Sequence, residues 1–487
     1  MFPLVLLFLS FVSSCLIIDP DLGWHIRLGD EMIRSHILIH NLVGYNNFFS
    51  ALKLPDHEWL SDILLVLIYK QIGFYGLCVV SAIITTLILA TVIYLCNSKK
   101  ASAISITLAL TLFFLPLSQI YGVRLQVLLL LLAILLLCIG LLVPNFKVRL
   151  VLNFVLFFFF SKLHAGTLAL ILIPITCEFL YTHNENNLKT ISRLIGKIFV
   201  LFIAIIVAIS INPYGLDLWR LSYDYWVDNF YKTNIAEWRP IYSIPILWQE
   251  VVFISTIIFF LFINLYWKKI PIPILMMLSI FLIAGCLHIR FLPIFAILVL
   301  PYLALSINDF QKNVINGKSL FALQVTAFLI VSLVLLMRAV PSQIQVRPAL
   351  EFVKNTRPEE GNMLNSYAVG GLIVWKYPDL KVFIDGRGPQ LKINNNTTIL
   401  QEYCNFFTND KAKTELMLKK YDISYVVIKK DQFSFSKIDK LLIKLSSRNH
   451  NQYNYVSPNS NLFKFLDDSP VWKKVFEDNS TIVYYKT

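Results

Sequence analysis

The residue types best suited to proton-transfer chemistry gather early in the chain, between Asp19 and Gly29. This stretch reads DPDLGWHIRLG and carries two carboxylates, an imidazole and a guanidinium beside a tryptophan. It follows directly on an apolar run from Phe2 to Ile18, which is about long enough to cross a bilayer. Ionisable side chains at the end of such a run are costly to desolvate, so they indicate a functional site. The alternative interpretation is that Asp19 and Pro20 end a helix and that the charges lie in headgroup water.

The composition is that of a polytopic membrane protein. Of the 487 residues, 57% are hydrophobic and only 15% are charged, whereas about a quarter are charged in soluble domains. Apolar runs of membrane-spanning length recur to about residue 340, and beyond it the chain turns polar and rich in Lys and Asn. We therefore predict a mostly α fold with a transmembrane helical bundle over residues 1–340 and a small soluble α/β domain over residues 341–487.

About eleven membrane spans are expected from the apolar runs. They are placed at 2–18, 75–96, 101–118, 123–143, 148–162, 165–181, 194–211, 249–267, 271–287, 289–306 and 319–339. With a cytoplasmic N-terminus, the short inner loops contain Lys99, Lys147 and Lys268, as the positive-inside rule requires. This topology makes the C-terminal domain extracytoplasmic and predicts location in the cytoplasmic (inner) membrane. It also accounts for the net charge of +13, so we reject nucleic-acid binding.

The same orientation places nearly every unusual polar side chain at the outer ends of spans or in two long outer loops, 19–74 and 212–248. Each of these side chains alone can be a snorkelling base or a helix cap. Their shared side predicts one outer cavity that collects them. The set comprises Asp19, Asp21, His25, Arg27, His57, Glu58, Arg124, Gln126, Lys162, His164, Asn212, Glu237, Arg239, His288 and Arg290.

Shorter elements are predicted from local patterns. Trp24 to Ser35 is expected to form an interfacial helix, Asp56 to cap the next helix, and NPYG to form a turn. In the C-terminal region, VRPALEFVKN and Lys411 to Lys420 predict helices. The segments LKVFIDGRG, SYVVIKK and STIVYYK predict strands, and residues 362–375 a strand or short helix broken at the glycine pair 370–371.

Eight short motifs follow one another along the chain. They are DPDLGWH, HEWL, VRLQ, LHAG, NPYG, AEWRP, HIRFLP and NSYAVGGLIVW with VFIDGRG. Their order resembles that of an uncharacterised prokaryotic family of multi-pass membrane proteins. That family is similar to the type-C glycosyltransferase superfamily, which includes protein O-mannosyltransferases, aminoarabinose transferases and oligosaccharyltransferases. The resemblance covers nearly the whole chain, although Gly23, Leu125, Lys162 and Gly388-Pro389 depart from the family's usual residues.

The resemblance implies an active site on the outer face of the membrane, with a polyprenyl-phosphate-linked sugar as the donor co-substrate. The acceptor is an envelope glycan, lipid or protein. Such a transfer needs a base for the acceptor hydroxyl and charge stabilisation for the departing phosphate. We expect Asp19, or else Asp21, to be the catalytic base. The same two carboxylates would hold a divalent cation if one is used, which the sequence leaves open.

The other outer polar residues are candidates for substrate binding. The guanidinium groups of Arg124 and Arg290 suit phosphate, and His57 and Glu58 are expected to orient the acceptor. The full set is His25, Arg27, His57, Glu58, Arg124, Gln126, Lys162, His164, Glu237, His288 and Arg290. For His57-Glu58-Trp59 the alternative is a helix start with an interfacial anchor. Asp385, Gly386 and Arg387 are expected to form a structural turn with an internal ion pair.

Two other functions remain open from the sequence. A transporter or flippase of lipid-linked material would need ionisable groups near mid-membrane and matching halves with broken helices, whereas the interiors here are mostly apolar. A non-catalytic envelope-assembly protein would use its outer C-terminal domain to bind a partner or glycan. The departures from the family's usual residues keep this last alternative open.

Overall fold

The computed structural model describes residues 7, 10–12, 14–15, 19–118, 122–181, 188–240, 270–314, 342–358, 360–394, 397–430 and 458–487. The chain divides into two compact units, which are treated separately. The first unit contains residues 1–17, 74–216 and 236–339. The second contains residues 18–73, 217–235 and 340–487, so parts of both predicted outer loops belong to the same unit as the C-terminal region.

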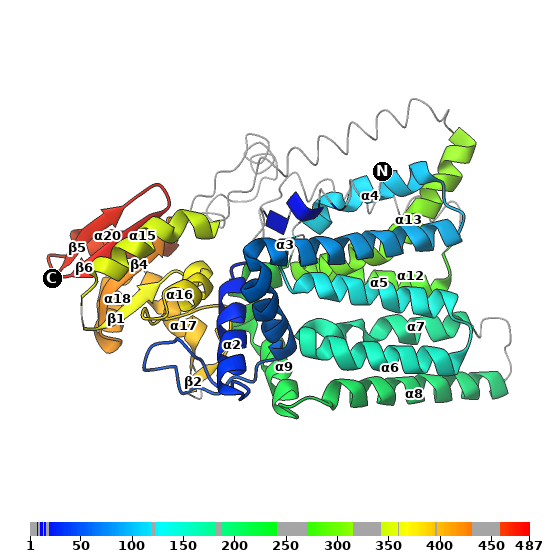
Figure 1. Ribbon diagram of the computed structural model, residues 1–487, viewed down its shortest axis with the longest axis horizontal. Coiled ribbons are helices and arrows are strands. Elements are labelled where there is room, and N and C mark those ends of the chain that lie inside the picture. Colours follow the sequence, from blue (N-terminus) through cyan, green and yellow to red (C-terminus); the bar gives the residue numbers. More distant parts are fainter. Residues whose placement is uncertain are drawn as a thin grey trace. The chain divides into compact units, whose positions relative to one another are not determined.

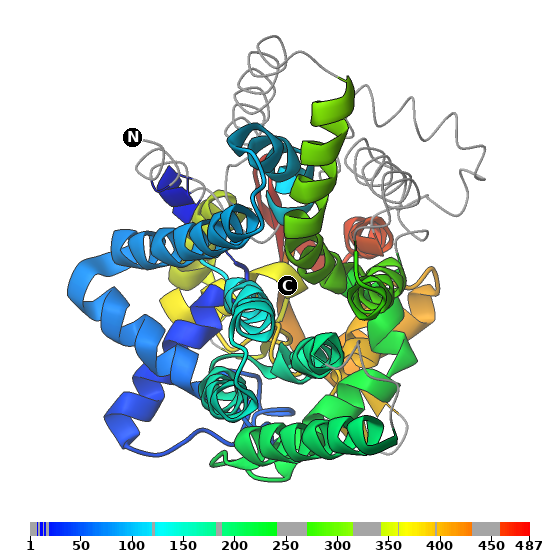
Figure 2. The ribbon, with the colours of Figure 1, turned by 90° about the vertical axis from the view of Figure 1, so that its right-hand side faces the viewer.

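The first unit is helical (Figures 1 and 2). Its helices are α4 (Ala103–Ser118), α5 (Gln126–Leu142), α6 (Phe146–Leu163), α7 (Leu172–Leu180), α8 (Leu188–Ser210), α12 (Ile272–Leu287) and α13 (Leu292–Val314). It also contains residues 74–98 of α3 (Trp59–Ser98), a helix whose backbone breaks at Gly73 with φ 73°. Short 3₁₀ segments, Ala165–Ile171, Ala236–Trp238 and Ile289–Phe291, complete it. Most of the predicted spans in the described residues are therefore helical.

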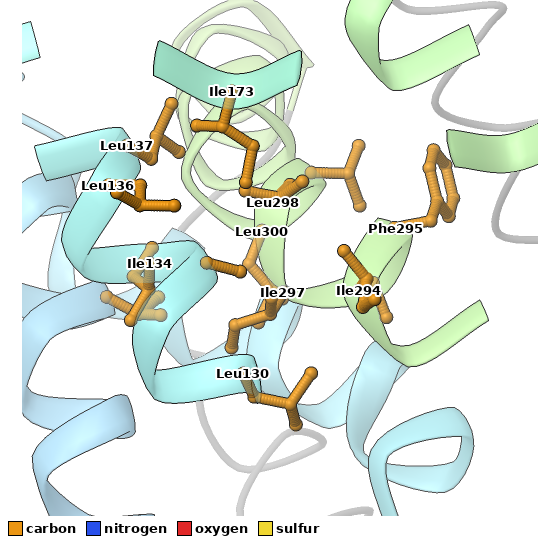
Figure 3. Packing of buried hydrophobic residues seen from close by; sticks show 14 of the residues in the cluster. Leu130, Ile134, Leu136, Leu137, Ile173, Ile294, Phe295, Ile297, Leu298 and Leu300 are labelled. Carbon is orange, nitrogen blue, oxygen red and sulfur yellow. The ribbon is translucent and has the colours of Figure 1, made fainter. Parts of the chain in front are cut away.

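The core of this unit is formed by α4, α5, α7, α12 and α13. Leu130, Ile134 and Leu137 of α5 pack against Ile297 and Leu298 of α13 (Figure 3), and each of these side chains is almost completely buried. Where such packing displaces water, the burial of apolar surface makes the main favourable contribution to the free energy of folding. Helices whose apolar residues surround them on all sides are typical of a membrane bundle or a large core.

Within the described residues, three helices are long and apolar enough to cross a membrane. They are Trp59–Ser98, Lys189–Ser210 and Ile289–Asn308, and the helices Gln126–Leu142, Ala165–Leu180 and Ile272–Leu287 are apolar but shorter. The segments expected to span at 249–267 and 319–339, and most of 2–18, lie outside the described residues. The number of about eleven spans therefore stays a prediction.

The second unit contains a four-stranded sheet of order β1-β4-β6-β5 (Figure 1). The helices α15 (Ser342–Thr356) and α20 (Pro458–Asp468) lie on its two opposite faces, because Phe352 of α15 contacts Tyr485 and Phe463 of α20 contacts Tyr484. The strands are β1 (Asn362–Asn365), β4 (Ile423–Lys429), β5 (Trp472–Glu477) and β6 (Thr481–Lys486). β1 pairs parallel with β4, and the other two pairings are antiparallel. The predicted α/β class of the C-terminal region is thus confirmed, as are the helix α18 (Lys411–Lys420) and the strands β4 and β6.

The remaining elements of this unit are short. They are α2 (Leu22–Ser35), residues 59–73 of α3, α9 (Asp217–Val227), α10 (Asn229–Asn234), α16 (Gly370–Lys376), α17 (Ile399–Cys404), a two-stranded sheet of β2 (Lys392–Asn394) and β3 (Thr397–Thr398), and 3₁₀ turns at Tyr367–Val369 and Asn405–Phe407. α2 extends the helix predicted from Trp24, and Asn212 accepts the N–H of Gly215 in the predicted NPYG turn of the first unit.

Two local predictions for the C-terminal region are wrong. LKVFIDGRG is not a strand, because only Val382 forms an isolated bridge, with Tyr45. Gly370 and Gly371 do not break an element but begin the helix α16. The reason is steric: a Cβ at Gly371 would overlap the carbonyl oxygen of Pro20, and one at Gly370 the carbonyl oxygen of Ile384. These glycines serve close backbone contact rather than a turn.

Candidate functional site

A buried group of ionisable side chains surrounds His25 in the second unit. His25 Nδ1 lies 2.6 Å from Asp62 Oδ1, and its Nε2 lies 3.5 Å from Glu58 Oε2. His25, Glu58 and Asp62 are 5%, 6% and 0% exposed. The two contacts come from α2 and the start of α3, so residues 37 positions apart in the chain meet here. We call His25, Asp56, Glu58 and Asp62 the His25 cluster.

A glycine sets the distance between the two helices that carry the cluster. Gly29 lies one helical turn beyond His25, on the same face of α2. A Cβ at Gly29 would be 2.5 Å from the carbonyl carbon of Asp62 and 3.0 Å from Val66 Cγ2. Glycine therefore permits the close crossing of α2 and α3 that brings His25 level with Asp62.

Asp56 completes the cluster from the turn before α3. Its Oδ1 accepts the backbone N–H of Glu58 at 3.0 Å. Because α3 begins at Trp59, Asp56 stabilises the turn before the helix and is not the predicted N-cap. Burial raises the pKa of the Asp56 carboxyl well above its usual range, and the neighbouring Asp62 carboxylate raises it further. Among the described residues, Asp56 Oδ2 and Asp62 Oδ2 accept no hydrogen bond from an N–H or O–H donor, yet the two carboxyl groups contact one another. Such a contact is favourable when the pair shares one proton.

His25 is neutral in this environment. Burial lowers the pKa of its imidazole to about 4, although the carboxylates of Asp21, Asp19 and Asp56 act in the opposite direction. A neutral imidazole carries one N–H, and the shorter of its two contacts, with Asp62, is the one that a charge-assisted hydrogen bond would give.

The two carboxylates predicted as catalytic lie at the start of α2. Asp19 is 7% exposed, and its Oδ1 accepts the backbone N–H of Asp21 at 3.0 Å. The Asp21 carboxylate lies against Gly386, where a Cβ would overlap it. The missing side chain of Gly386 therefore leaves space for the Asp21 carboxylate. Through this contact, the DPDLGWH motif packs against the Asp-Gly-Arg motif.

The Asp-Gly-Arg motif is a buried turn with an internal ion pair, as predicted. Arg387 Nη2 lies 2.5 Å from Asp385 Oδ2, and both side chains are at most 1% exposed. Tyr45 donates from its hydroxyl to Asp385 Oδ1 at 2.7 Å, and the Arg387 guanidinium lies 5.0 Å from the Tyr45 ring centre. Burial raises the pKa of Tyr45 well above its usual range, and the Asp385 carboxylate raises it further. The tyrosine is thus a fixed hydrogen-bond donor.

Two other predicted residues of this unit lie at its edge. Arg27 forms a partly exposed ion pair with Glu31, 3.4 Å apart and one turn along α2. His57 Nε2 lies 3.9 Å from Glu58 Oε1, and its ring centre lies 6.4 Å from that of Tyr225. Of these two, only His57 adjoins the His25 cluster.

A second polar group lies in the first unit. Arg290 Nη1 lies 3.6 Å from Glu237 Oε1, and its guanidinium lies 4.4 Å from the Trp238 ring centre. Gln126 donates to Glu237 Oε2 at 3.4 Å, and His288 Nδ1 is 2.7 Å from the Trp238 carbonyl oxygen. The structure therefore brings together four predicted residues from three motifs: VRLQ, AEWRP and HIRFLP.

Lys162 and His164 have local contacts at the end of α6. Lys162 Nζ donates to the Phe158 carbonyl oxygen at 2.6 Å and lies 3.4 Å from the Phe158 ring centre. His164 Nδ1 accepts the backbone N–H of Gly166 at 2.9 Å. Arg124 lies immediately before α5, where its backbone N–H bonds to Gly122.

The predicted site residues thus fall into two groups, one in each unit. Asp19, Asp21, His25, Arg27, His57 and Glu58 belong to the second unit, and Arg124, Gln126, Lys162, His164, Glu237, His288 and Arg290 to the first. The single outer cavity stays a prediction. Within the described ranges, no three His, Cys, Asp or Glu side chains are placed to hold a metal ion.

Sequence reasoning missed two buried charged contacts. Asp62 lies four residues after Glu58 in an otherwise apolar segment. Two acids at this spacing lie on one side of a helical turn, and this spacing was the signal in the sequence that could have indicated the cluster. Arg149, two residues after the predicted inner-loop Lys147, is 1% exposed and forms a two-pronged ion pair with Glu178, with both N···O distances 2.7 Å. Nothing in the local sequence distinguishes Arg149 from a loop cation.

No protein-family model matches the chain, and a search of curated proteins finds no match. Three solved structures from Archaeoglobus fulgidus are similar. The archaeal oligosaccharyltransferase AglB in complex with an inhibitory peptide and a dolichol-phosphate is 15% identical, with 88% of this chain and 69% of that chain covered and a TM-score of 0.46. The apo oligosaccharyltransferase is 14% identical, with coverage of 87% and 69% and a TM-score of 0.46. Its complex with Zn and sulfate is 15% identical, with coverage of 87% and 68% and a TM-score of 0.38. At these TM-scores the likeness carries no conclusion about function.

Proposed function

We propose that this protein is an integral-membrane glycosyltransferase. It transfers a sugar from a polyprenyl-phosphate donor to an envelope glycan, lipid or protein on the outer face of the cytoplasmic membrane. The order of motifs along the sequence supports this class of reaction. The observation that carries the proposal is that the first two motifs, DPDLGWH and HEWL, meet in one buried acid–base cluster through His25 and Glu58.

In the proposed reaction, Asp19 takes the proton of the acceptor hydroxyl. The hydroxyl oxygen attacks the anomeric carbon of the donor sugar, and the bond from that carbon to the phosphate oxygen breaks. The polyprenyl phosphate leaves with the electron pair of that bond. Asp19 is assigned the role of base because its side chain is buried, 7% exposed, and lies in the first motif of the chain.

Arg290 and Arg124 are the proposed phosphate-binding residues, because a guanidinium offers paired donors to phosphate. Arg290 is partly buried against Trp238 and paired with Glu237 at 3.6 Å, a distance longer than a strong charge-assisted hydrogen bond. A phosphate can therefore compete with Glu237 for this guanidinium. Arg124 is the second arginine in this role, with Lys162, His164 and His288 as further donors, and Gln126 fixes Glu237.

The test is transfer by the purified protein. We would combine it with polyprenyl-linked sugars extracted from its native membranes and an envelope fraction, and measure the release of polyprenyl phosphate by mass spectrometry. The variant Asp19→Asn/Asp21→Asn is expected to lose release by at least about 10²-fold, the usual contribution of a general base. The matched control is Asp217→Asn, whose side chain is 62% exposed. Equal release by the wild type and the double variant would refute the assignment of the base.

A further inference from the structure

Asp62 links His25 to a second acid of the His25 cluster, Asp56. One of its oxygens contacts His25 Nδ1 at 2.6 Å, and its carboxyl group also contacts Asp56. The side chain is 0% exposed. A fully buried carboxylate is retained only where its partners satisfy it. The contacts with His25 and Asp56 thus hold the Asp62 side chain in one position.

The two nitrogens of His25 have unequal partners. The 2.6 Å contact with Asp62 has the length of a short hydrogen bond, and with Asp62 ionised Nδ1 is the donor. The 3.5 Å distance from Nε2 to Glu58 is too long for a good hydrogen bond. In the neutral ring, Nε2 is therefore left with its lone pair directed toward the Glu58 side of the cluster.

We propose that Asp62 is a positioning residue that fixes the tautomer of His25, so that His25 Nε2 is the atom through which the cluster takes up a proton. In this arrangement a carboxylate hydrogen-bonds one nitrogen of the imidazole and so orients the other nitrogen to act as a base. On uptake at Nε2 the ring becomes an imidazolium, whose charge Asp62 stabilises. The proton shared by Asp56 and Asp62 keeps the resting cluster from holding three unpaired negative charges.

The role of this proton in catalysis rests on the proposed function. In the transfer reaction, the acceptor oxygen forms the glycosidic bond and its proton passes to Asp19. Asp19, whose carboxylate acts electrostatically on His25, would pass this proton to His25 Nε2, and after product release the proton returns to solvent. The geometry of His25 and Asp62 does not depend on that use.

Several charged groups besides Asp62 act on His25. Asp19 and Asp21 lie just before α2, Asp56 lies in the turn before α3, and Arg387 in the Asp-Gly-Arg turn acts as a positive charge. Glu58, the residue directly before α3, faces Nε2. A change in pH dependence therefore has to be assigned by substitution of Asp62 itself.

The tautomer is measured directly by nitrogen NMR of the full chain labelled with ¹⁵N-histidine, in lipid at pH 7, with His25→Gln to identify the signals. The wild type is expected to show a protonated Nδ1 and an unprotonated Nε2. Asp62→Asn is expected to change this pattern, because an amide can donate to Nδ1 and favour the other tautomer. The control is Asp30→Asn, which alters an acid of α2 that pairs with Lys70 at the surface. A wild-type ring protonated at Nε2, or at both nitrogens, would overturn the proposal.

The same variants are then compared in the transfer assay across pH. Asp62→Asn is expected to lower transfer by about 10²-fold or more and to shift the pH at which activity falls on the acid side. Asp30→Asn is expected to keep the wild-type profile. If no preparation transfers sugar, the function has failed and the NMR result still decides the tautomer. If the wild type transfers and Asp62→Asn has an unchanged rate and profile, the positioning role is wrong.

Discussion

The substitution Gly29→Ala tests how α2 and α3 are held together at the His25 cluster. The added Cβ would lie 2.5 Å from the Asp62 carbonyl carbon, whereas unstrained carbon atoms approach to about 3.5 Å. The helices must therefore separate by about 1 Å, or the surrounding residues must shift by as much. The contact between His25 Nδ1 and Asp62 Oδ1 would lengthen from 2.6 Å to about 3.6 Å, which is no longer a hydrogen bond.

The cost follows from these changes. A lost hydrogen bond to a charged group costs about 1.5–3 kcal/mol, and overpacking a close helix crossing costs about 1–3 kcal/mol. Alanine is the better helix former by about 1 kcal/mol, which offsets part of this loss. We therefore expect Gly29→Ala to lower the free energy of unfolding by about 2–5 kcal/mol.

The assay is denaturant-induced unfolding of the purified protein in detergent, followed by the fluorescence of its tryptophans, of which Trp24 is buried in α2. The matched control is Gly196→Ala in α8, where an added Cβ meets nothing within 4 Å. The control should be as stable as the wild type or slightly more stable. If Gly29→Ala matches the control, the close crossing does not hold the cluster and the reasoning is wrong.

Three further predictions concern the second unit. Asp385→Asn should destabilise the protein by about 3–5 kcal/mol, measured by the same unfolding assay, because it leaves the buried Arg387 cation without its carboxylate. Gly386→Ala should displace the Asp21 carboxylate and lower transfer with little change in the amount of folded protein in membranes. The unfolding free energy should fall as pH is lowered from about 6.5 toward 4, because unfolded His25 binds a proton that the native ring, with a pKa of about 4, does not. His25→Gln should remove that part of the pH dependence.

Each of these predictions has a contradicting result. Asp385→Asn with wild-type stability would mean that the ion pair does not hold the turn. Gly386→Ala with full transfer would separate the Asp-Gly-Arg turn from the site. An identical slope between pH 4 and 6.5 in the wild type and His25→Gln would mean that the native ring titrates as it does in the unfolded chain.

Periodic patterns predicted the elements well where local sequence decides them. Lys411–Lys420 is a helix with the predicted bounds, and its N-cap is Asp410, whose side chain accepts two backbone N–H groups. The strand at Ile423–Lys429 is buried along most of its length, as its apolar run indicated. In contrast, the Gly370-Gly371 pair was interpreted as a break, because the need for a close backbone contact cannot be seen in the local sequence.

The candidate site was predictable in its residue types but not in its partners. The DPDLGWH stretch predicts a functional site because its ionisable groups follow an apolar run, and His25 and Asp19 are buried in the structure. Asp62 was overlooked because it lies in an apolar segment where its side chain has no local partner. Only the crossing of α2 and α3, which depends on Gly29, makes Asp62 the neighbour of His25. Long-range contacts of this kind are set by tertiary packing, not by sequence spacing.

The central claim, transfer of a lipid-linked sugar at the acidic motif, is tested most directly in cells. We would compare total polyprenyl-linked sugars and envelope glycans between cells with the wild-type protein and cells with Asp19→Asn/Asp21→Asn, at equal protein levels in the membrane. The account predicts that one polyprenyl-linked sugar accumulates in the variant while one glycan decoration disappears, which would identify the class of donor and acceptor. Unchanged pools of both would contradict it and would favour a non-catalytic role in envelope assembly.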